Sequence, residues 1–423
     1  MAIALPRGMR DLPPNEAISI KEIIGVCEEV FKRFGFVPLE TPAVENLEVL
    51  TAKAYGEDAS RQLFTLEGEE AALRYDLTVP LARYVAMNKS LQLPFKRYQI
   101  GYTWRKEEPQ RMRYREFLQA DIDIIGSKEL GSDAEVIAAP AIILDRLGLK
   151  DYVILLNSRI IIEAILETFG VPKDKEKEAI RALDKIQKLS SSEVIEMLKG
   201  LGLEGRVCEE LLSFVSQDVR AEGFDRLAEK LESATPEIEK MSRLVEAIEG
   251  YGISGRVKVD LSLARGLDYY TGLVCEFVFE RDGKRLPSAC GGGRYDNLIG
   301  MFSKKDIPAT GMSLGISRLL DLFELNKTAR TYAKAFVAYI TEEDADFARK
   351  AANRIRNGGI YTDLNVMDRN ISKQLEYASA LGIKYVVIVG KKERQRGVVR
   401  LRNMVSGEEE SISLTEAIEK MKK

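Results

Sequence analysis

Residues 99–126 concentrate side chains that could bind a charged ligand. From Tyr114 to Ile125 polar and apolar residues alternate, which is the pattern of a strand whose two faces differ. One face carries a guanidinium, a ring, an amide and two carboxylates, from Arg115, Phe117, Gln119, Asp121 and Asp123. Because burial of such a polar row without partners is costly, we expect it to form the floor of a site for a polar, charged ligand. The alternative is a solvent-exposed hairpin with internal ion pairs.

Two arginines bracket the loop between this strand and the preceding one, which ends at Trp104. Arg105 and Arg113 each offer a planar, permanently charged fork, the side-chain group that best matches a phosphate or a carboxylate. Gln110 and Arg111 lie between them. The loop therefore predicts an anion site at one end of the hairpin.

The sequence of 423 residues contains no histidine. This excludes Ser-His-Asp and Cys-His catalysis, acid–base chemistry by a protein imidazole, and metal sites with histidine ligands. The four cysteines are scattered and form no CxxC pair, so we expect neither a zinc ribbon nor a disulfide framework, and no metal-ligating residues. Any catalysis must use carboxylates, arginines, bound ions or groups of the substrate.

Two further segments carry residues suited to ligand binding. Asp76 and Thr78 lie where a predicted strand ends, and a carboxylate with a hydroxyl suits an ammonium group, although Thr78 could instead cap a helix. Residues 265–272 form an Arg-Gly-Leu-Asp-Tyr-Tyr-Thr-Gly turn between strands. Tyr269 and Tyr270 point to opposite faces if this turn is extended, so at least one of them should line a site.

Glycines mark the last two candidate segments. Cys290 to Asp296 reads Cys-Gly-Gly-Gly-Arg-Tyr-Asp, and we interpret it as a strand-to-helix turn whose glycines let the backbone approach a ligand closely. Thr310 to Leu320 reads as a strand of small residues that runs into a helix containing Arg318.

The elements that must position these residues follow from periodicity and from Gly and Pro. Apolar spacing predicts helices at 14–34, 79–87 and 132–147, an extended segment at 36–42, and strands at 152–156, 256–260 and 273–277. Helix-length segments with few strand-like runs fill 160–250. From 335 onward strands and helices alternate, which predicts a separate α/β domain with a mostly parallel sheet.

Residues 99–126 resemble motif 2 of class II aminoacyl-tRNA synthetases, in the form found in histidyl-tRNA synthetases. Residues 14–42 resemble motif 1, residues 310–320 resemble motif 3, and residues 265–272 resemble the histidine-specific signature. The resemblance implies an α+β fold with an antiparallel sheet flanked by helices. It divides the chain into a catalytic domain at 1–160 and 253–325, a helical insertion at 161–252, a linker at 326–332 and an α/β anticodon-binding domain at 333–423.

The resemblance also implies an activity, namely ATP-dependent activation of L-histidine to an adenylate and its transfer to tRNA-His, with ATP and Mg²⁺ as cofactors. By this resemblance Arg105 and Arg265 are catalytic, and Arg105, Arg113 and Arg318 bind ATP. The loop residues Gln110 and Arg111 meet the acceptor end of the tRNA. The implied histidine-binding residues are Asp76, Thr78, Gln119, Asp123, Arg265, Tyr269, Tyr270 and Tyr295. The motif 1 region implies a homodimer.

Composition and net charge indicate the cellular location of the protein and where its tRNA contact should lie. Hydrophobic residues make up 45% and charged residues 30% of the chain, as in a soluble globular protein. With no apolar run near the length of a membrane span and no signal-peptide core, we expect a cytoplasmic protein. The net charge of −3 means that a tRNA binder needs localised positive charge. The basic run at 391–402 is the candidate, and a solvated charged edge is an equal alternative.

Two rival functions stay open at this stage. One is a non-catalytic paralogue, of the kind that serves as the histidine-sensing regulatory subunit of ATP phosphoribosyltransferase; such paralogues lack the C-terminal domain and have a degraded histidine signature. The other is a related class II synthetase for a different amino acid. Histidine-dependent exchange of pyrophosphate into ATP distinguishes all three.

Overall fold

The protein is described by a computed structural model that covers residues 3–51, 61–110, 112–186, 189–264, 269–281, 284–303, 305–322 and 330–422. The chain divides into two compact units, residues 1–10 with 23–323, and residues 11–22 with 324–423. Helix α1 (Pro14–Arg33) is continuous, as the sequence predicts, and Gly35 follows it in the left-handed conformation.

The first unit is built on a mixed sheet with the strand order β1-β4-β5-β11-β10-β8-β6-β7, and β9 pairs with β8. Neighbouring strands are antiparallel except at the two ends, where β1 pairs with β4 and β6 pairs with β7 in parallel. The strands are β1 (Val37–Pro38), β4 (Phe95–Trp104), β5 (Glu116–Ile125), β6 (Tyr152–Ser158), β7 (Val257–Val259), β8 (Leu273–Arg281), β9 (Lys284–Arg285), β10 (Cys290–Arg294) and β11 (Ala309–Gly315).

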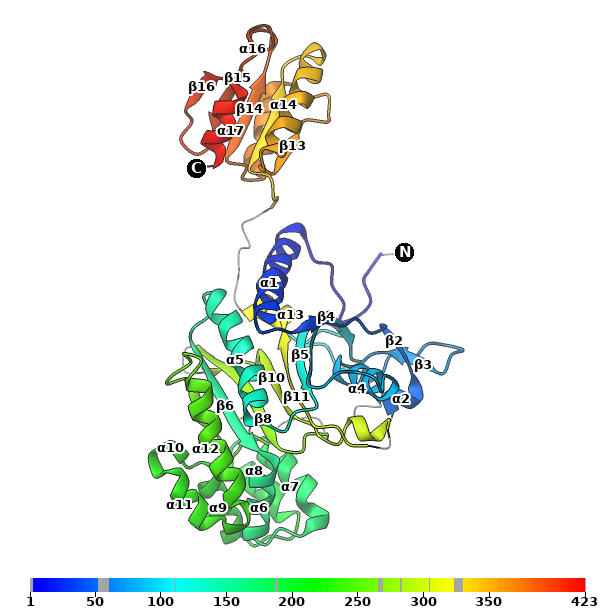
Figure 1. The fold of residues 1–423 in the computed structure, drawn as a ribbon, viewed down its shortest axis with the longest axis vertical. Helices are drawn as coiled ribbons and strands as arrows, with labels where there is room; N and C mark the ends of the chain where they lie inside the picture. Colours follow the sequence, from blue (N-terminus) through cyan, green and yellow to red (C-terminus); the bar gives the residue numbers. More distant parts are fainter. Residues whose placement is uncertain are drawn as a thin grey trace. The chain divides into compact units, whose positions relative to one another are not determined.

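The hairpin predicted from the alternating pattern is present as β4 and β5, which pair over their whole length. From Leu118 onward the even-numbered residues of β5, among them Ile122 and Ile124, are at most 5% exposed. Helix α5 (Leu130–Arg146) contacts β5, β10 and β11, and helix α13 (Ile316–Leu322) contacts β5 (Figure 1). The apolar face of β5 is therefore covered, and its polar face is directed to the other side of the sheet.

The glycines at 291–293 lie inside strand β10 and not in a strand-to-helix turn, so that prediction is wrong. Gly292 pairs with Met312 of β11 and Gly293 with Val274 of β8. A Cβ at Gly292 would meet the carbonyl oxygen of Gly311 at 2.0 Å, and one at Gly293 would meet that of Leu273 at 2.1 Å. Close approach of neighbouring backbones requires glycine at both positions.

A small sheet beside the main one carries the segment that leads to Asp76. Strand β2 (Val44–Asn46) pairs with β3 (Ala71–Leu73). Residues 62–78 also form a short hairpin, with one bridge between Thr65 and Ala72 and two flanking backbone hydrogen bonds. Helices α2 (Leu47–Thr51) and α4 (Thr78–Met87) contact each other, and the short helix η3 (Ile299–Met301) contacts α4.

Helices occupy the segment between β6 and β7, and they gather at one end of the unit (Figure 1). They are α6 (Arg159–Thr168), η1 (Lys173–Lys175), α7 (Glu176–Leu183), α8 (Ser191–Lys199), α9 (Gly205–Val215), α10 (Val219–Glu222), α11 (Phe224–Lys230), η2 (Glu232–Ala234) and α12 (Thr235–Glu249). Helix α12 packs along α5 and so connects this helical insertion to the sheet.

The C-terminal part of the second unit is a five-stranded sheet with the order β13-β12-β14-β15-β16. The first three strands are parallel, as expected, but β15 and β16 are antiparallel, so the sheet is mixed. The elements are β12 (Ala335–Tyr339), η4 (Glu342–Asp344), α14 (Ala345–Asn357), β13 (Thr362–Leu364), α15 (Ile371–Ala380), β14 (Tyr385–Val389), α16 (Lys391–Arg396), β15 (Val399–Asn403), β16 (Glu409–Ile412) and α17 (Leu414–Lys422).

Candidate active site

A cavity of about 370 Å³ lies over the polar face of β5. Ten of the candidate residues line it together, although they come from six separate segments of the chain: Asp76, Thr78, Arg105, Arg113, Gln119, Asp123, Tyr269, Tyr270, Tyr295 and Arg318. The cavity is large enough for a small organic ligand, and its lining carries both cations and carboxylates.

Cationic groups of three arginines belong to this lining. The guanidinium carbon of Arg105 lies 4.2 Å from the ring centroid of Tyr75 and 5.1 Å from that of Phe117, and its Nε donates to the carbonyl of Tyr75 at 3.3 Å. Nη1 of Arg318 donates to the carbonyl of Ser288 at 2.5 Å. Arg113 is more exposed and lies 3.6 Å from a carboxylate oxygen of Glu107. These contacts orient the forks of Arg105 and Arg318 beside the cavity, where they suit an anionic ligand.

A chain of polar side chains fixes the amide of Gln119. Its oxygen accepts from the hydroxyl of Thr103 at 2.9 Å, and its nitrogen donates to the hydroxyl of Ser313 at 2.5 Å. Ser313 in turn donates to Asp121. Burial raises the pKa of Asp121 to about 7, although the charge of Arg97 opposes this shift. The amide therefore presents a fixed orientation to a ligand above β5.

Asp123 is held from two sides. Tyr295 donates its hydroxyl hydrogen to Oδ1, and Nη2 of Arg97 lies 2.7 Å from Oδ2. Both charged groups are at most 3% exposed. Burial raises the pKa of Asp123, whereas Arg97 and the Tyr295 hydroxyl lower it. A carboxylate in this environment is a strong acceptor for a ligand N–H, because little water competes for it.

Three tyrosine rings form one wall of the cavity. The centroids of Tyr269 and Tyr270 are 4.9 Å apart, and those of Tyr269 and Tyr295 are 5.8 Å apart, both in edge-to-face geometry. Burial raises the pKa of Tyr270, so its hydroxyl stays protonated. Both tyrosines of the pair contribute to the cavity, where the sequence required at least one.

Asp76 caps helix α4, so the alternative in which Thr78 is the N-cap is wrong. Oδ1 of Asp76 accepts from the backbone N–H groups of Thr78 at 3.1 Å and Val79 at 3.0 Å. Leu77 occupies the N-cap position before Thr78, the first helical residue, but its side chain makes no capping hydrogen bond, so the carboxylate of Asp76 takes that role. Capping fixes the carboxylate of Asp76, which is 4% exposed, at the edge of the cavity.

Among the described residues, Gln110 is the one candidate that does not line the cavity. Arg265 and Arg111 lie outside the described residues. Gln110 is exposed in the loop between β4 and β5, where its backbone exchanges hydrogen bonds with Arg113 across a tight turn. Met112 adopts a left-handed backbone conformation in this turn, with φ 65°.

Strand β4 supplies supporting residues that the sequence reasoning missed. Arg97, Gln99 and Thr103 are fully buried, and β4 places Arg97 opposite Asp123 and Gln99 opposite Asp121. The signal was present, because polar or small residues recur at every second position of this strand. A search for period-2 polarity on the first arm of the hairpin finds them.

Ser317 accepts a hydrogen bond at its Oγ from the backbone N–H of Leu118, at 2.9 Å.

Among the described residues no cluster of three or more Cys, Asp or Glu side chains is arranged to hold a metal ion. In the same part of the chain, no helix has both the length and the apolar character needed to cross a bilayer.

Comparison with known proteins gives matches over almost the whole chain. The family model described as histidyl-tRNA synthetase matches residues 8–319, and a model described as an anticodon binding domain matches residues 334–423. A curated histidine–tRNA ligase of Aeropyrum pernix is 39% identical, and the alignment covers 98% of this chain and 96% of that protein.

Solved structures agree with this result. The histidyl-tRNA synthetase of Nostoc sp. PCC 7120 superposes with a TM-score of 0.88 at 29% identity and covers 100% of this chain and 99% of that chain. A Bacillus halodurans protein described as an ATP phosphoribosyltransferase regulatory subunit/histidyl-tRNA synthetase gives a TM-score of 0.77 at 26% identity, with coverage of 92% and 98%.

Proposed function

Because the chain belongs to the histidyl-tRNA synthetase family, with the class II synthetase fold, we propose that its cavity activates L-histidine with ATP and transfers it to tRNA-His. One observation carries the proposal. The arginine forks of the loop between β4 and β5 and of α13 line the same cavity as the carboxylates of β5, so a triphosphate and an amino acid can be held side by side.

The activation step forms a bond between a carboxylate oxygen of histidine and the α-phosphorus of ATP, and it breaks the bond to pyrophosphate. Arg105 and Arg265 stabilise the charge that develops on the α-phosphate, and Arg113 and Arg318 bind the remaining phosphates. The rings of Tyr75 and Phe117 hold Arg105 in place, so little reorganisation is needed during the reaction.

The histidine end of the cavity is the wall of tyrosines with Asp123 and Gln119. An imidazole needs a hydrogen-bond partner at each nitrogen, and a carboxylate with a tyrosine hydroxyl forms such a pair. We assign this task to Asp123 and Tyr270. Asp76 and Thr78 bind the α-ammonium group, Arg265 binds the carboxylate, and Tyr269 and Tyr295 complete the pocket.

Mg²⁺ fits this site as a partner of the phosphates. This ion keeps several waters and needs only one or two carboxylates when phosphates supply the other ligands, and the glutamates that line the cavity are Glu107 and Glu276. The ion would supply positive charge that offsets the charge of the triphosphate. Arg318 shares this task.

Transfer requires a base to take the proton of the terminal ribose hydroxyl. The enzyme contains no histidine, and we propose that a phosphate oxygen of the adenylate accepts that proton as the acyl–phosphate bond breaks. Gln110 and Arg111 meet the acceptor end. The C-terminal domain reads the anticodon, which the match to an anticodon binding domain supports.

Assembly and location extend the proposal. Strand β1 is an edge strand of the main sheet, and its residue Val37 is 49% exposed. Both observations support a homodimer through the motif 1 region. A cytoplasmic location agrees with the names of the relatives as tRNA ligases.

Pyrophosphate exchange into ATP, measured with each amino acid in turn, tests the function. We expect exchange with histidine alone. Arg105→Ala and Arg265→Ala should each lower the exchange rate by at least about a hundredfold, which is the usual effect of removing one hydrogen-bond donor from an oxyanion hole. Histidine binding without exchange would favour the regulatory paralogue, and exchange with another amino acid would reassign the substrate.

A further inference from the structure

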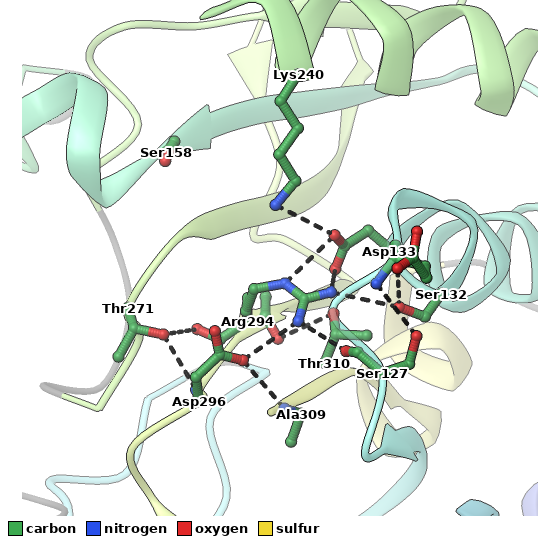
Figure 2. Close-up of polar contacts among 12 residues, drawn as sticks. Ser127, Ser132, Asp133, Ser158, Lys240, Thr271, Arg294, Asp296, Ala309 and Thr310 are labelled. Atoms are coloured by element: carbon green, nitrogen blue, oxygen red, sulfur yellow. Dashed lines mark hydrogen bonds and ion pairs between the residues drawn. The ribbon is translucent and has the colours of Figure 1, made fainter. Parts of the chain in front are cut away.

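A buried ionic network lies next to the candidate histidine pocket but outside the cavity lining (Figure 2). Its centre is Arg294, the last residue of β10, which is 4% exposed. Nε and Nη2 donate to the two carboxylate oxygens of Asp133 at 3.3 and 2.8 Å. Nη1 donates to Asp296 at 3.2 Å and to the carbonyl of Ser127 at 3.0 Å, and Nη2 also donates to Ser132 at 3.3 Å. With its donors all occupied by protein groups, Arg294 has a positioning task and not a ligand-binding one.

The network holds both sides of the candidate pocket. The backbone carbonyl of Arg294 accepts from the N–H of Thr271 at 2.8 Å, and the hydroxyl of Thr271 accepts from the N–H of Asp296 at 3.0 Å. Thr271 directly follows the tyrosine pair, and Tyr295, next to Arg294, donates to Asp123. A shift of Arg294 would therefore move the tyrosines and the carboxylate together.

The helical insertion reaches the same network at two points. Nζ of Lys240, on α12, lies 3.9 Å from Oδ2 of Asp133, and Figure 2 shows its side chain extending from the helix toward that carboxylate. At the other end of the insertion, the N–H of Arg159 donates to the carbonyl of Gly272 at 2.8 Å. The first contact reaches the network at Asp133 of α5, and the second holds the segment that carries Thr271.

We propose that Lys240, Asp133 and Arg294 form a positioning chain that couples the helical insertion to the histidine pocket. This inference rests on the proposed function. Asp133 is completely buried, and it faces one buried arginine and one partly exposed lysine. Because a buried carboxylate demands compensation, displacement of α12 removes part of its partner set and loosens Arg294. A change in the position of α12 would in this way change the affinity of the pocket for histidine.

Steady-state pyrophosphate exchange with full-length variants tests the chain. Asp133→Asn keeps the shape of the side chain but removes its charge. It should raise KM for histidine about tenfold, which corresponds to a tenfold loss of affinity, and leave KM for ATP within about twofold of the wild-type value. Lys240→Met should raise KM for histidine about two- to fivefold, as for a partly exposed ion pair, and Lys240→Arg should restore it. The double variant should be no worse than Asp133→Asn alone, because both changes interrupt one chain.

Two matched controls test whether the effect is specific to Lys240 and Asp133. Arg243→Met alters an exposed cation one turn along α12, and Asp145→Asn alters a carboxylate at the other end of α5 that pairs with Arg256 at 2.5 and 2.9 Å. Both should leave KM for histidine unchanged. Equal effects of the controls, equal rises of both KM values, or multiplying effects in the double variant would each overturn the proposal.

The wild-type enzyme separates this proposal from the function on which it rests. Absence of histidine-dependent exchange in the wild type counts against the function alone. Histidine binding, followed by calorimetry in the same variants, still reports on the coupling in that case. If Asp133→Asn does not fold, Lys240→Met with its arginine rescue decides the question.

Discussion

At the scale of single residues, the main finding is that the two carboxyl groups of the pocket floor are buried and have different partners. Asp123 is balanced by Arg97, whereas Asp121 has a hydroxyl partner and is only 2% exposed. A buried carboxyl whose pKa is raised binds its proton more tightly in the folded chain than in the unfolded chain. Its ionisation therefore costs stability.

We expect Asp121→Asn to show this cost as a pH dependence. The pKa of Asp121 is about 7 in the fold against 3.8 in the unfolded chain, so its contribution to the free energy of unfolding falls as pH rises from about 4 to about 7. The stability of the variant relative to wild type should therefore rise across this window, by up to about 4 kcal/mol at about 1.4 kcal/mol per pH unit. Denaturant unfolding of both proteins at each pH measures the difference.

A constant difference between the two proteins from pH 4 to pH 8 would contradict a raised pKa. Asp145→Asn is the opposite control. Hydrogen bonding from Arg256 lowers the pKa of Asp145, so wild type should lose stability relative to that variant as pH falls below about 4.

At the scale of elements, glycines decide how closely the central strands approach. Strand β10 lies between β8 and β11, and a Cβ at Gly311 of β11 would meet Oδ1 of Asp123 at 2.0 Å. The run of glycines is thus a packing requirement of the sheet, and Gly291 and Gly292 also line the cavity, although they do so from a strand and not from the predicted turn. Local composition could not distinguish the two, since both need backbone without side chains.

Gly292→Ala and Gly291→Ala make a matched pair on this strand. The added methyl group at 292 meets backbone atoms at 2.0 and 2.7 Å, whereas at 291 its nearest neighbour is the carbonyl oxygen of Cys275 at 3.4 Å. We expect Gly292→Ala to lower stability by about 1–3 kcal/mol or more through overpacking. Gly291→Ala should stay close to wild type, and calorimetric unfolding of both variants compares them. Equal stability of the two would refute the close-approach argument.

At the scale of the whole molecule, the residues that line the cavity come from positions 76 to 318, all within the first unit. The C-terminal sheet carries the basic run that the sequence offered as a tRNA contact. Three of its six cations, Arg394, Arg400 and Arg402, form ion pairs with carboxylates of their own domain. The others, Lys391, Lys392 and Arg396, are exposed on α16. The run is therefore part ion-paired edge and part exposed positive surface.

Deletion of residues 330–423 should leave histidine-dependent pyrophosphate exchange in place and reduce charging of tRNA-His. The reason is that the cavity loses no lining residue, whereas the proposed anticodon contact is removed. The two assays on the truncated and full-length chains measure this separation. Equal loss of both activities would show that adenylate formation depends on the C-terminal domain.

The sequence by itself determined the hairpin of β4 and β5, the helices that follow from apolar spacing and ten of the residues that line the cavity. These depend on local periodicity and on side-chain chemistry, which the order of residues carries directly. Only the tertiary structure decided that Arg97 faces Asp123, that Asp76 caps α4 and that Arg294 pairs with Asp133 across 161 positions. Such pairings depend on strand register and helix packing, which bring together residues that no local pattern connects.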